Sequence, residues 1–230
     1  MGFEDSLNDR LDAMWAKFFS DQRDVYIPTY FDTLKKNCPL FIGMNPSFSM
    51  RNFKKTVPNF TENEISDSYK WNGKNERNLS VDHGKESKDK LNFFKKFADI
   101  ANEAGFEKWE HIDLFQYRMT SQTEFKKIIF EDKKETTLNQ FGKEQLKLAW
   151  HLIEYIAPSF ILIANAKASD IFLDYFESEL EFSEVKCLHY MRINSNKTPV
   201  FFSSMLSGQR ALDRYSVDRL TWHIKTIIAT

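Results

Sequence analysis

Cysteine is scarce in this chain, with only Cys38 and Cys187 among 230 residues. Neither stands in a C-x-x-C pair or in a Cys/His cluster. A disulfide framework, a structural zinc site and a four-cysteine iron–sulfur cluster are therefore not expected. We expect both cysteines to be small, buried apolar side chains.

Long apolar runs and an excess of charge are also missing. No segment approaches the ~18 consecutive apolar residues of a membrane span, and the opening MGFEDSLNDR has no apolar stretch of the signal-peptide kind. The formal net charge of −1 neither favours nor excludes nucleic acid, because a local basic face is enough for brief contact. We expect a cytoplasmic protein with no membrane contact, metal or cofactor. The candidate basic residues are Arg51, Lys54, Lys55, Arg210, Arg214 and Arg219.

Apolar residues make up 42% of the chain, enough for a substantial core, and their spacing alternates between helical and extended. The run FILIAN (160–165) is typical of a central parallel strand buried on both faces. The alternation predicts a single α/β domain over 1–230, a three-layer α/β/α sandwich around a mostly parallel four-stranded sheet. Residues 1–35 form a helical extension, and 51–85 form an irregular insertion without clean periodicity. Helices are expected at 4–19, 87–104, 143–157, 167–178 and from the N-cap candidate Ser216 onward, and strand candidates are 39–44, 109–115, 160–165, 185–190 and 199–204.

Ligands of parallel sheets bind where the strands end. Polar residues follow an apolar run at four such ends, in GMNPS, DLFQYR, ANAKAS and SSMLSGQR. We therefore expect the functional residues at one edge of the sheet.

The first of these ends is GMNPS, residues 43–47. Gly43 permits a close backbone approach, and Pro46 biases Asn45 toward an extended conformation. The Asn45 amide is no base, but its carbonyl oxygen can hold a water molecule. An ordinary Asn-Pro turn is the competing interpretation.

The last end, residues 202–210, leaves its strand through three serines that flank Met205 and Leu206. Small polar groups suit DNA phosphates, and an apolar side chain on such a loop suits a wedge between bases. Alternatively, Leu206 folds back onto the core.

Together the two ends resemble the uracil-DNA glycosylase superfamily. GMNPS is similar to its first motif, which reads GQDPY in the uracil-specific enzymes and GINPG or GMNPG in the mismatch-specific and single-strand-selective branches. FSSMLS (202–207) is in register with its second motif, HPSPLS or NPSGLN. DLFQYR and FILIANAKAS also resemble strands of this superfamily, so the likeness extends over residues 36–228.

The resemblance implies a monomeric DNA glycosylase that removes a damaged or deaminated base in base-excision repair, after the base is flipped out of the stack. Asn45 would position the attacking water. The residues implied to bind the base are Gly43, Met44, Ser47, Phe48 and Asp113, with Phe53 as another ring that could stack on it. Those implied to bind DNA are Ser204, Met205, Leu206, Ser207 and Arg210.

This sequence departs from the superfamily pattern at five positions, of which Ser203 stands in place of a proline and Asp113 in place of an asparagine. Phe202 replaces the histidine that stabilises the departing base, and Asn45 replaces an aspartate, so a slow enzyme is expected. Ser47 replaces a tyrosine that excludes thymine, which leaves room for bases other than uracil.

Two other functions remain open. The first is a catalytically weak or inactive member of the superfamily that binds nucleic acid or nucleotides. The second, a serine hydrolase, ranks last because no G-x-S-x-G motif is present. The five histidines are expected to be ordinary helix, strand or loop residues.

Overall fold

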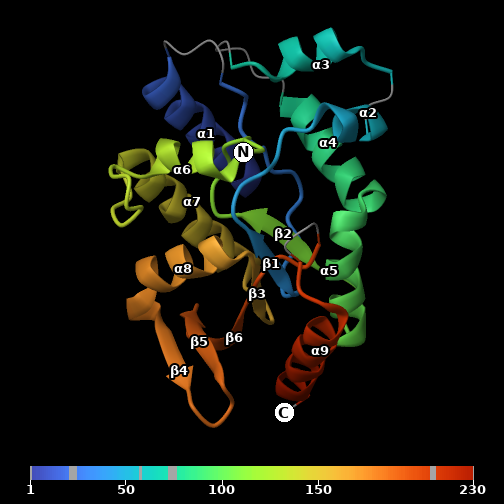
Figure 1. Cartoon of the computed structure of the whole chain (residues 1–230), viewed down its shortest axis with the longest axis vertical. Coiled ribbons are helices and arrows are strands. Elements are labelled where there is room, and N and C mark those ends of the chain that lie inside the picture. Colours follow the sequence, from blue (N-terminus) through green and yellow to red (C-terminus); the bar gives the residue numbers. More distant parts are fainter. Residues whose placement is uncertain (1, 21–24, 57–58, 72–76, 208–210, 230) are drawn as a thin grey trace. The chain divides into compact units, whose positions relative to one another are not determined.

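The computed structural model describes residues 2–20, 25–56, 59–71, 77–207 and 211–229. The chain divides into two compact units, each assembled from three stretches of sequence (Figure 1). We call them the helical unit and the sheet unit. The helical unit comprises Met1–Leu34, Asn45–Leu91 and Phe115–Leu148, and the sheet unit comprises Lys35–Met44, Asn92–Leu114 and Ala149–Thr230.

The sheet unit holds a six-stranded, mostly parallel sheet in the order β2-β1-β3-β6-β5-β4. The first four strands in that order are mutually parallel, whereas β5 and β4 continue the sheet antiparallel. FILIAN contains the central strand β3, buried along its whole length as predicted. The strands are β1 (Leu40–Gly43), β2 (Glu110–Asp113), β3 (Ile161–Ala164), β4 (Leu180–Ser183), β5 (Leu188–Ile193) and β6 (Asn196–Ser203).

The expected count of four strands was wrong because of this antiparallel extension. β4 alternates apolar and polar residues and lies exposed or half-buried at the sheet edge, so it has no continuous apolar run. A two-residue turn joins β5 to β6, with Asn194 and Ser195 at φ 47° and 70°. Such a turn fits an antiparallel hairpin and not a parallel crossover.

Helices cover both faces of the sheet within this unit (Figure 1). On one face, α5 (Asn92–Glu103) and α9 (Arg214–Ile228) bury an apolar cluster that includes Phe41, Phe97 and Phe201. On the other face, α8 (Ala166–Tyr175) packs on β3 and β6, and its Phe172 ring lies 6.1 Å from that of Phe202. The short 3₁₀ helix η1 (Glu177–Glu179) leads from α8 into β4.

The helical unit contains helices in the segment that was expected to be irregular. Residues 51–85 carry α2, α3 and most of α4. α3 begins with a capping box, in which the Thr61 side chain accepts from the Glu64 N–H and the Glu64 carboxylate accepts from the Thr61 N–H. The helices of this unit are α1 (Phe3–Phe19), α2 (Met50–Thr56), α3 (Glu62–Tyr69), α4 (Arg77–Lys90), α6 (Gln122–Ile129) and the first part of α7 (Gln140–Ile156).

The hydrophobic pattern missed these helices because their buried faces are partly polar. The residues that α4 buries are Ser80, His83 and Ser87, none of them aliphatic. α2 and α3 are short and contribute few apolar side chains each. A periodicity test reads such segments as loops.

Several boundaries also differ from expectation. The helix expected at 87–104 is divided, since α4 ends at Lys90 and α5 begins at Asn92, while Gly105 follows α5 at φ 88°, as a C-terminal stop should. The N-cap of α9 is Asp213, whose carboxylate accepts from the Ser216 N–H.

Of the two cysteines, Cys38 is buried as expected, but Cys187 lies exposed in a turn. No described helix combines the length and apolar character that crossing a membrane requires.

Candidate functional site

The segment that follows β1 is held in place by a second segment of the helical unit, residues 117–120. The Met119 N–H donates to the Pro46 carbonyl at 2.9 Å, and the Thr120 hydroxyl donates to the Phe48 carbonyl at 2.6 Å. The boundary between the units falls after Met44, so Asn45, Pro46 and Ser47 belong to the helical unit. The backbone directly after Asn45 is thereby held at two points.

The Asn45 amide has a fixed orientation. Its Nδ2 donates to the carbonyls of Met119 at 2.8 Å, Tyr117 at 3.2 Å and Pro46 at 3.3 Å. Because all three neighbours are acceptors, the nitrogen must face them and the oxygen must face away. Within the described residues, Oδ1 of this half-buried side chain accepts no hydrogen bond. Asn45 therefore presents an anchored acceptor.

The aromatic rings near this segment differ in accessibility. The half-buried Phe48 ring stacks on Tyr26 at 4.0 Å and 9°. Phe53 is 1% exposed and stacks on His83 at 3.7 Å, so it belongs to the core of the unit. Of the two rings considered for base stacking, Phe48 is half-buried and Phe53 is almost completely buried.

In the sheet unit, Gly43 and Asp113 are partners across the β1–β2 ladder. A Cβ at position 43 would overlap the Asp113 carboxylate and would approach His111 Nε2 to 3.3 Å. Gly43 is therefore required by the close approach of Asp113.

His111 is a neighbour of Asp113 that the sequence interpretation missed. Its Nε2 lies 3.9 Å from Asp113 Oδ1, and the two side chains are 10% and 12% exposed. The His111 ring also stacks on Phe97 of α5, with centroids 5.5 Å apart. Residues two apart on a strand share a face, so the alternation EHID already contained this signal.

The second motif places its residues differently from expectation. Leu206 is 4% exposed and belongs to the apolar core that includes Phe201 and Val217. It cannot enter a base stack without leaving this core, so we assign Leu206 to packing and not to a DNA wedge.

The other residues of that loop that the structure describes are half-buried. The Leu212 N–H donates to the Met205 carbonyl at 2.9 Å, and the Ser203 hydroxyl donates to the Ser204 carbonyl at 2.9 Å. Ser204, Met205 and Ser207 keep partial exposure, whereas Arg210 lies outside the described residues.

Two further motif positions are apolar and packed. Met44 is 3% exposed, so only its backbone could reach a ligand. The Phe202 ring meets those of Phe172 at 6.1 Å and His189 at 5.3 Å, and burial lowers the pKa of His189 below its usual value. Ser47, in contrast, is exposed.

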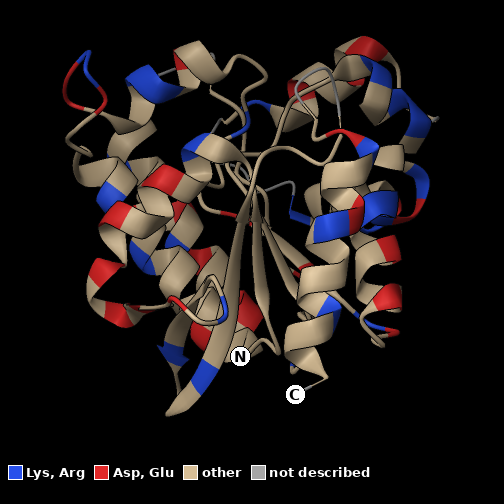
Figure 2. Cartoon of the chain, turned by 60° about the horizontal axis from the view of Figure 1, so that its bottom comes forward, with Lys and Arg blue, Asp and Glu red and all other residues tan. Residues whose placement is uncertain are grey.

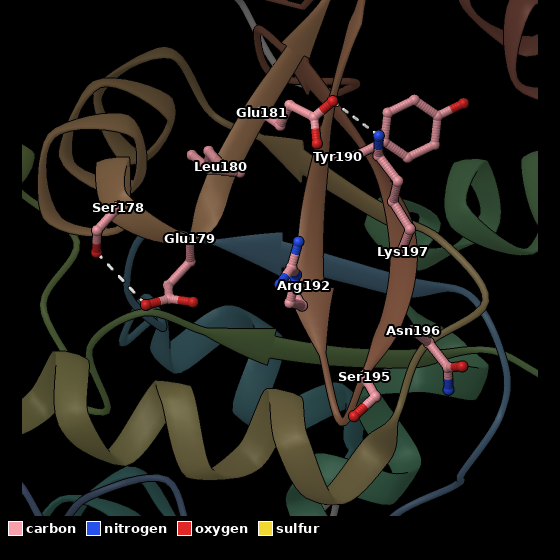
Figure 3. A pocket seen from close by; sticks show the side chains of 9 residues that line it. All are labelled: Ser178, Glu179, Leu180, Glu181, Tyr190, Arg192, Ser195, Asn196 and Lys197. Carbon is pink, nitrogen blue, oxygen red and sulfur yellow. Dashed lines mark hydrogen bonds and ion pairs between the residues drawn. The ribbon is translucent and has the colours of Figure 1, made fainter.

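A separate hollow of about 500 Å³ lies over the β4–β5–β6 end of the sheet (Figure 3). In it, the Lys197 ammonium lies 2.9 Å from Glu181 and 4.8 Å from the centre of the Tyr190 ring. The hydrogen bond from Lys197 lowers the pKa of Glu181. Lys197 and Ser203 stand six residues apart on β6, about 20 Å, so this hollow is separate from the second motif.

Charges of both signs are interleaved over the surface helices (Figure 2). On α2, Lys54 pairs with Glu62 at 2.7 Å. On α9, Arg219 lies between two strongly exposed aromatic side chains, Tyr215 at 77% and Trp222 at 67%. The exposed surface of α9 therefore carries arginines, two open rings and the Asp218 carboxylate, which lies 3.9 Å from Arg214.

In the part of the chain that the structure describes, no group of three or more His, Cys, Asp or Glu side chains is arranged to hold a metal ion. No protein-family model and no curated protein matches the sequence.

Proposed function

We propose that this chain is a monofunctional DNA glycosylase that hydrolyses the N-glycosidic bond of a damaged or deaminated base. The observation that carries the proposal is the Asn45 amide, whose nitrogen is bound to three backbone carbonyls while its oxygen is left as an acceptor. This is the group that the resemblance to the uracil-DNA glycosylase superfamily assigns to the attacking water.

In the proposed reaction, Asn45 Oδ1 accepts a hydrogen bond from the water and directs its oxygen at the anomeric carbon of the flipped nucleotide. The C–N bond breaks as the C–O bond forms, and the base departs with the bonding electrons. One water proton is released and the base is protonated, which leaves an abasic site. A neutral amide suffices because it only orients the water and the departing base carries the negative charge.

Base selection is assigned to the region around Gly43. Asp113 accepts hydrogen bonds when ionised, so it favours a base with a donor such as an exocyclic amino group. The exposed Ser47 leaves space where a tyrosine would exclude larger substituents.

We further infer a three-layer α/β/α sandwich and a monomeric, cytoplasmic enzyme that contacts DNA through Ser204, Ser207 and the exposed surface of α9. The second candidate function is a non-catalytic nucleic-acid binder. It is favoured by Phe202, which packs against Phe172 and His189 and whose ring has no hydrogen-bond donor to offer a departing base.

One assay separates these two functions. The protein is incubated with single- and double-stranded oligonucleotides that carry uracil, hypoxanthine, xanthine or ethenocytosine, and abasic sites are then cleaved with alkali. We expect product on at least one substrate. Salt-sensitive DNA binding with no product on any substrate would refute the enzyme and support the binder.

A further inference from the structure

We propose that Arg118 is a positioning residue that fixes the Asn45 amide, and that the three helices of residues 51–85 serve to hold Arg118. The effect of Arg118 on catalysis rests on the proposed function, whereas its effect on the orientation of the Asn45 amide follows from the geometry alone. All residues in the argument belong to the helical unit.

Arg118 stands between the two residues whose carbonyls bind the Asn45 nitrogen most closely. Met119 accepts from it at 2.8 Å and Tyr117 at 3.2 Å. Any displacement of the Arg118 backbone moves both acceptors. The orientation of the amide therefore depends on where the Arg118 side chain is anchored.

That side chain is anchored in α4. Arg118 is 3% exposed and donates to the Ser80 hydroxyl at 2.8 Å. Ser80 is fully buried, donates to the Pro28 carbonyl at 3.3 Å and accepts from the Tyr30 N–H at 3.4 Å. The hydroxyl thus uses its single donor and both acceptor sites, which defines its position.

The guanidinium also packs on the other two helices. Its carbon lies 5.2 Å from the centre of the Tyr69 ring on α3 and 5.8 Å from that of Phe53 on α2. Both rings are almost fully buried. One side chain therefore contacts all three helices of the insertion, and this gives the insertion a role that its polar sequence did not indicate.

The arrangement suits arginine and not lysine. A planar guanidinium donates from its edge while its faces lie against aromatic rings, whereas an ammonium is a compact point charge. A lysine at position 118 keeps the charge but cannot reproduce the hydrogen bond and both ring contacts together. Arg118→Lys is thus a mild change that should still loosen the anchor.

The direct test is the side-chain amide signal of Asn45 in a ¹⁵N–¹H spectrum, assigned by its loss in Asn45→Ala. In Arg118→Lys we expect this signal to shift and its hydrogen exchange to accelerate at least tenfold. Arg77→Lys is the matched control, because Arg77 lies on α4 but pairs with Asp9 and Asp12 of α1. It should leave the Asn45 signal unchanged.

An unchanged Asn45 signal in Arg118→Lys, or an equal change in Arg77→Lys, would overturn the proposal. If Arg118→Lys does not fold, Ser80→Ala removes the same hydrogen bond from the other side and is expected to give the same shift.

Activity supplies the second readout. If the wild type releases a base, Arg118→Lys should lower kcat about tenfold with KM unchanged, since Arg118 does not touch the substrate. An altered amide signal in a chain without glycosylase activity would uphold the Arg118 anchor and reject the proposed function. If Arg118→Lys alters the Asn45 amide signal but leaves kcat unchanged in an active enzyme, the claim that Arg118 contributes to catalysis is rejected.

Discussion

Acidification should destabilise the helical unit through one buried histidine. His83 is 7% exposed, its ring lies 3.7 Å from that of Phe53, and its Nε2 is 3.3 Å from the Ser87 hydroxyl. Burial and, to a smaller extent, the positive charge of Arg118 together lower the pKa of His83 to about 3. Between that pKa and the unfolded pKa of about 6.5, the unfolded chain binds a proton that the folded chain does not.

The free energy of unfolding therefore falls as the pH falls through this window. Linkage gives a loss of about 2 kcal/mol between pH 7.5 and pH 5, rising to a ceiling of about 5 kcal/mol well below pH 3. The perturbation is His83→Gln, which cannot protonate at either pH. Urea denaturation of both proteins at pH 7.5 and pH 5, followed by circular dichroism, measures the difference.

We expect the wild type to lose about 2 kcal/mol more than His83→Gln over this range. The other four histidines are common to both proteins, so they cancel in the comparison. Equal losses in the two proteins would refute the reasoning. An NMR titration that finds the folded pKa of His83 near 6.5 would refute it as well.

Three further substitutions probe the site and its supports. Asn45→Asp restores the aspartate of the uracil-specific enzymes, but we expect it to lower the thermal midpoint and not to increase activity. The reason is that a carboxylate has no proton to donate to the three carbonyl oxygens that Asn45 Nδ2 binds. A variant more active than the wild type would contradict this. Gly43→Ala should destabilise the sheet unit, because the added Cβ would overlap the Asp113 carboxylate. Gly84→Ala is the control, since Gly84 has open space around it on α4, and it should raise the free energy of unfolding by up to about 1 kcal/mol in the same denaturation assay. Equal effects of the two substitutions would contradict the close approach of Asp113 to Gly43. Leu206→Ala should lower the free energy of unfolding by about 2–5 kcal/mol, because Leu206 is buried in the core. Met205→Ala is the control and should have a smaller effect. A loss in Leu206→Ala no greater than that in Met205→Ala would contradict the packing of Leu206 in the core.

Part of this architecture could be predicted from the sequence because strong local signals carry it. The run FILIAN has one plausible structure, a buried strand, and Gly105 marks the end of a helix. The four parallel strands β1, β2, β3 and β6 all overlap strand candidates of the sequence, at 39–44, 109–115, 160–165 and 199–204. For these elements, local preference and tertiary environment agree.

The rest depended on contacts between residues far apart in the chain. Phe53, Tyr69, Ser80 and Arg118 come from four separate segments, and no local pattern shows that they meet. β4 is an exposed edge strand whose structure comes from pairing with β5. Contacts between distant segments determine the structure in both cases, so local sequence patterns could not predict it.

The candidate site shows the same division. GMNPS pointed to Asn45, but only the structure shows that its nitrogen is bound by 117–119. For Leu206, the serine-rich loop alone favoured packing on the core, and the resemblance to the superfamily favoured a wedge. Burial decided for the core.

The most direct test of the central claim is the single-turnover rate of base release by the wild type and by Asn45→Ala, on the oligonucleotide that the wild type cleaves best. We predict that the wild type releases the base and that Asn45→Ala is slower by roughly 10–1000-fold, the scale for losing a positioned polar group. Equal rates for the two proteins would contradict the role of Asn45. Release of no base by either protein would contradict the glycosylase itself.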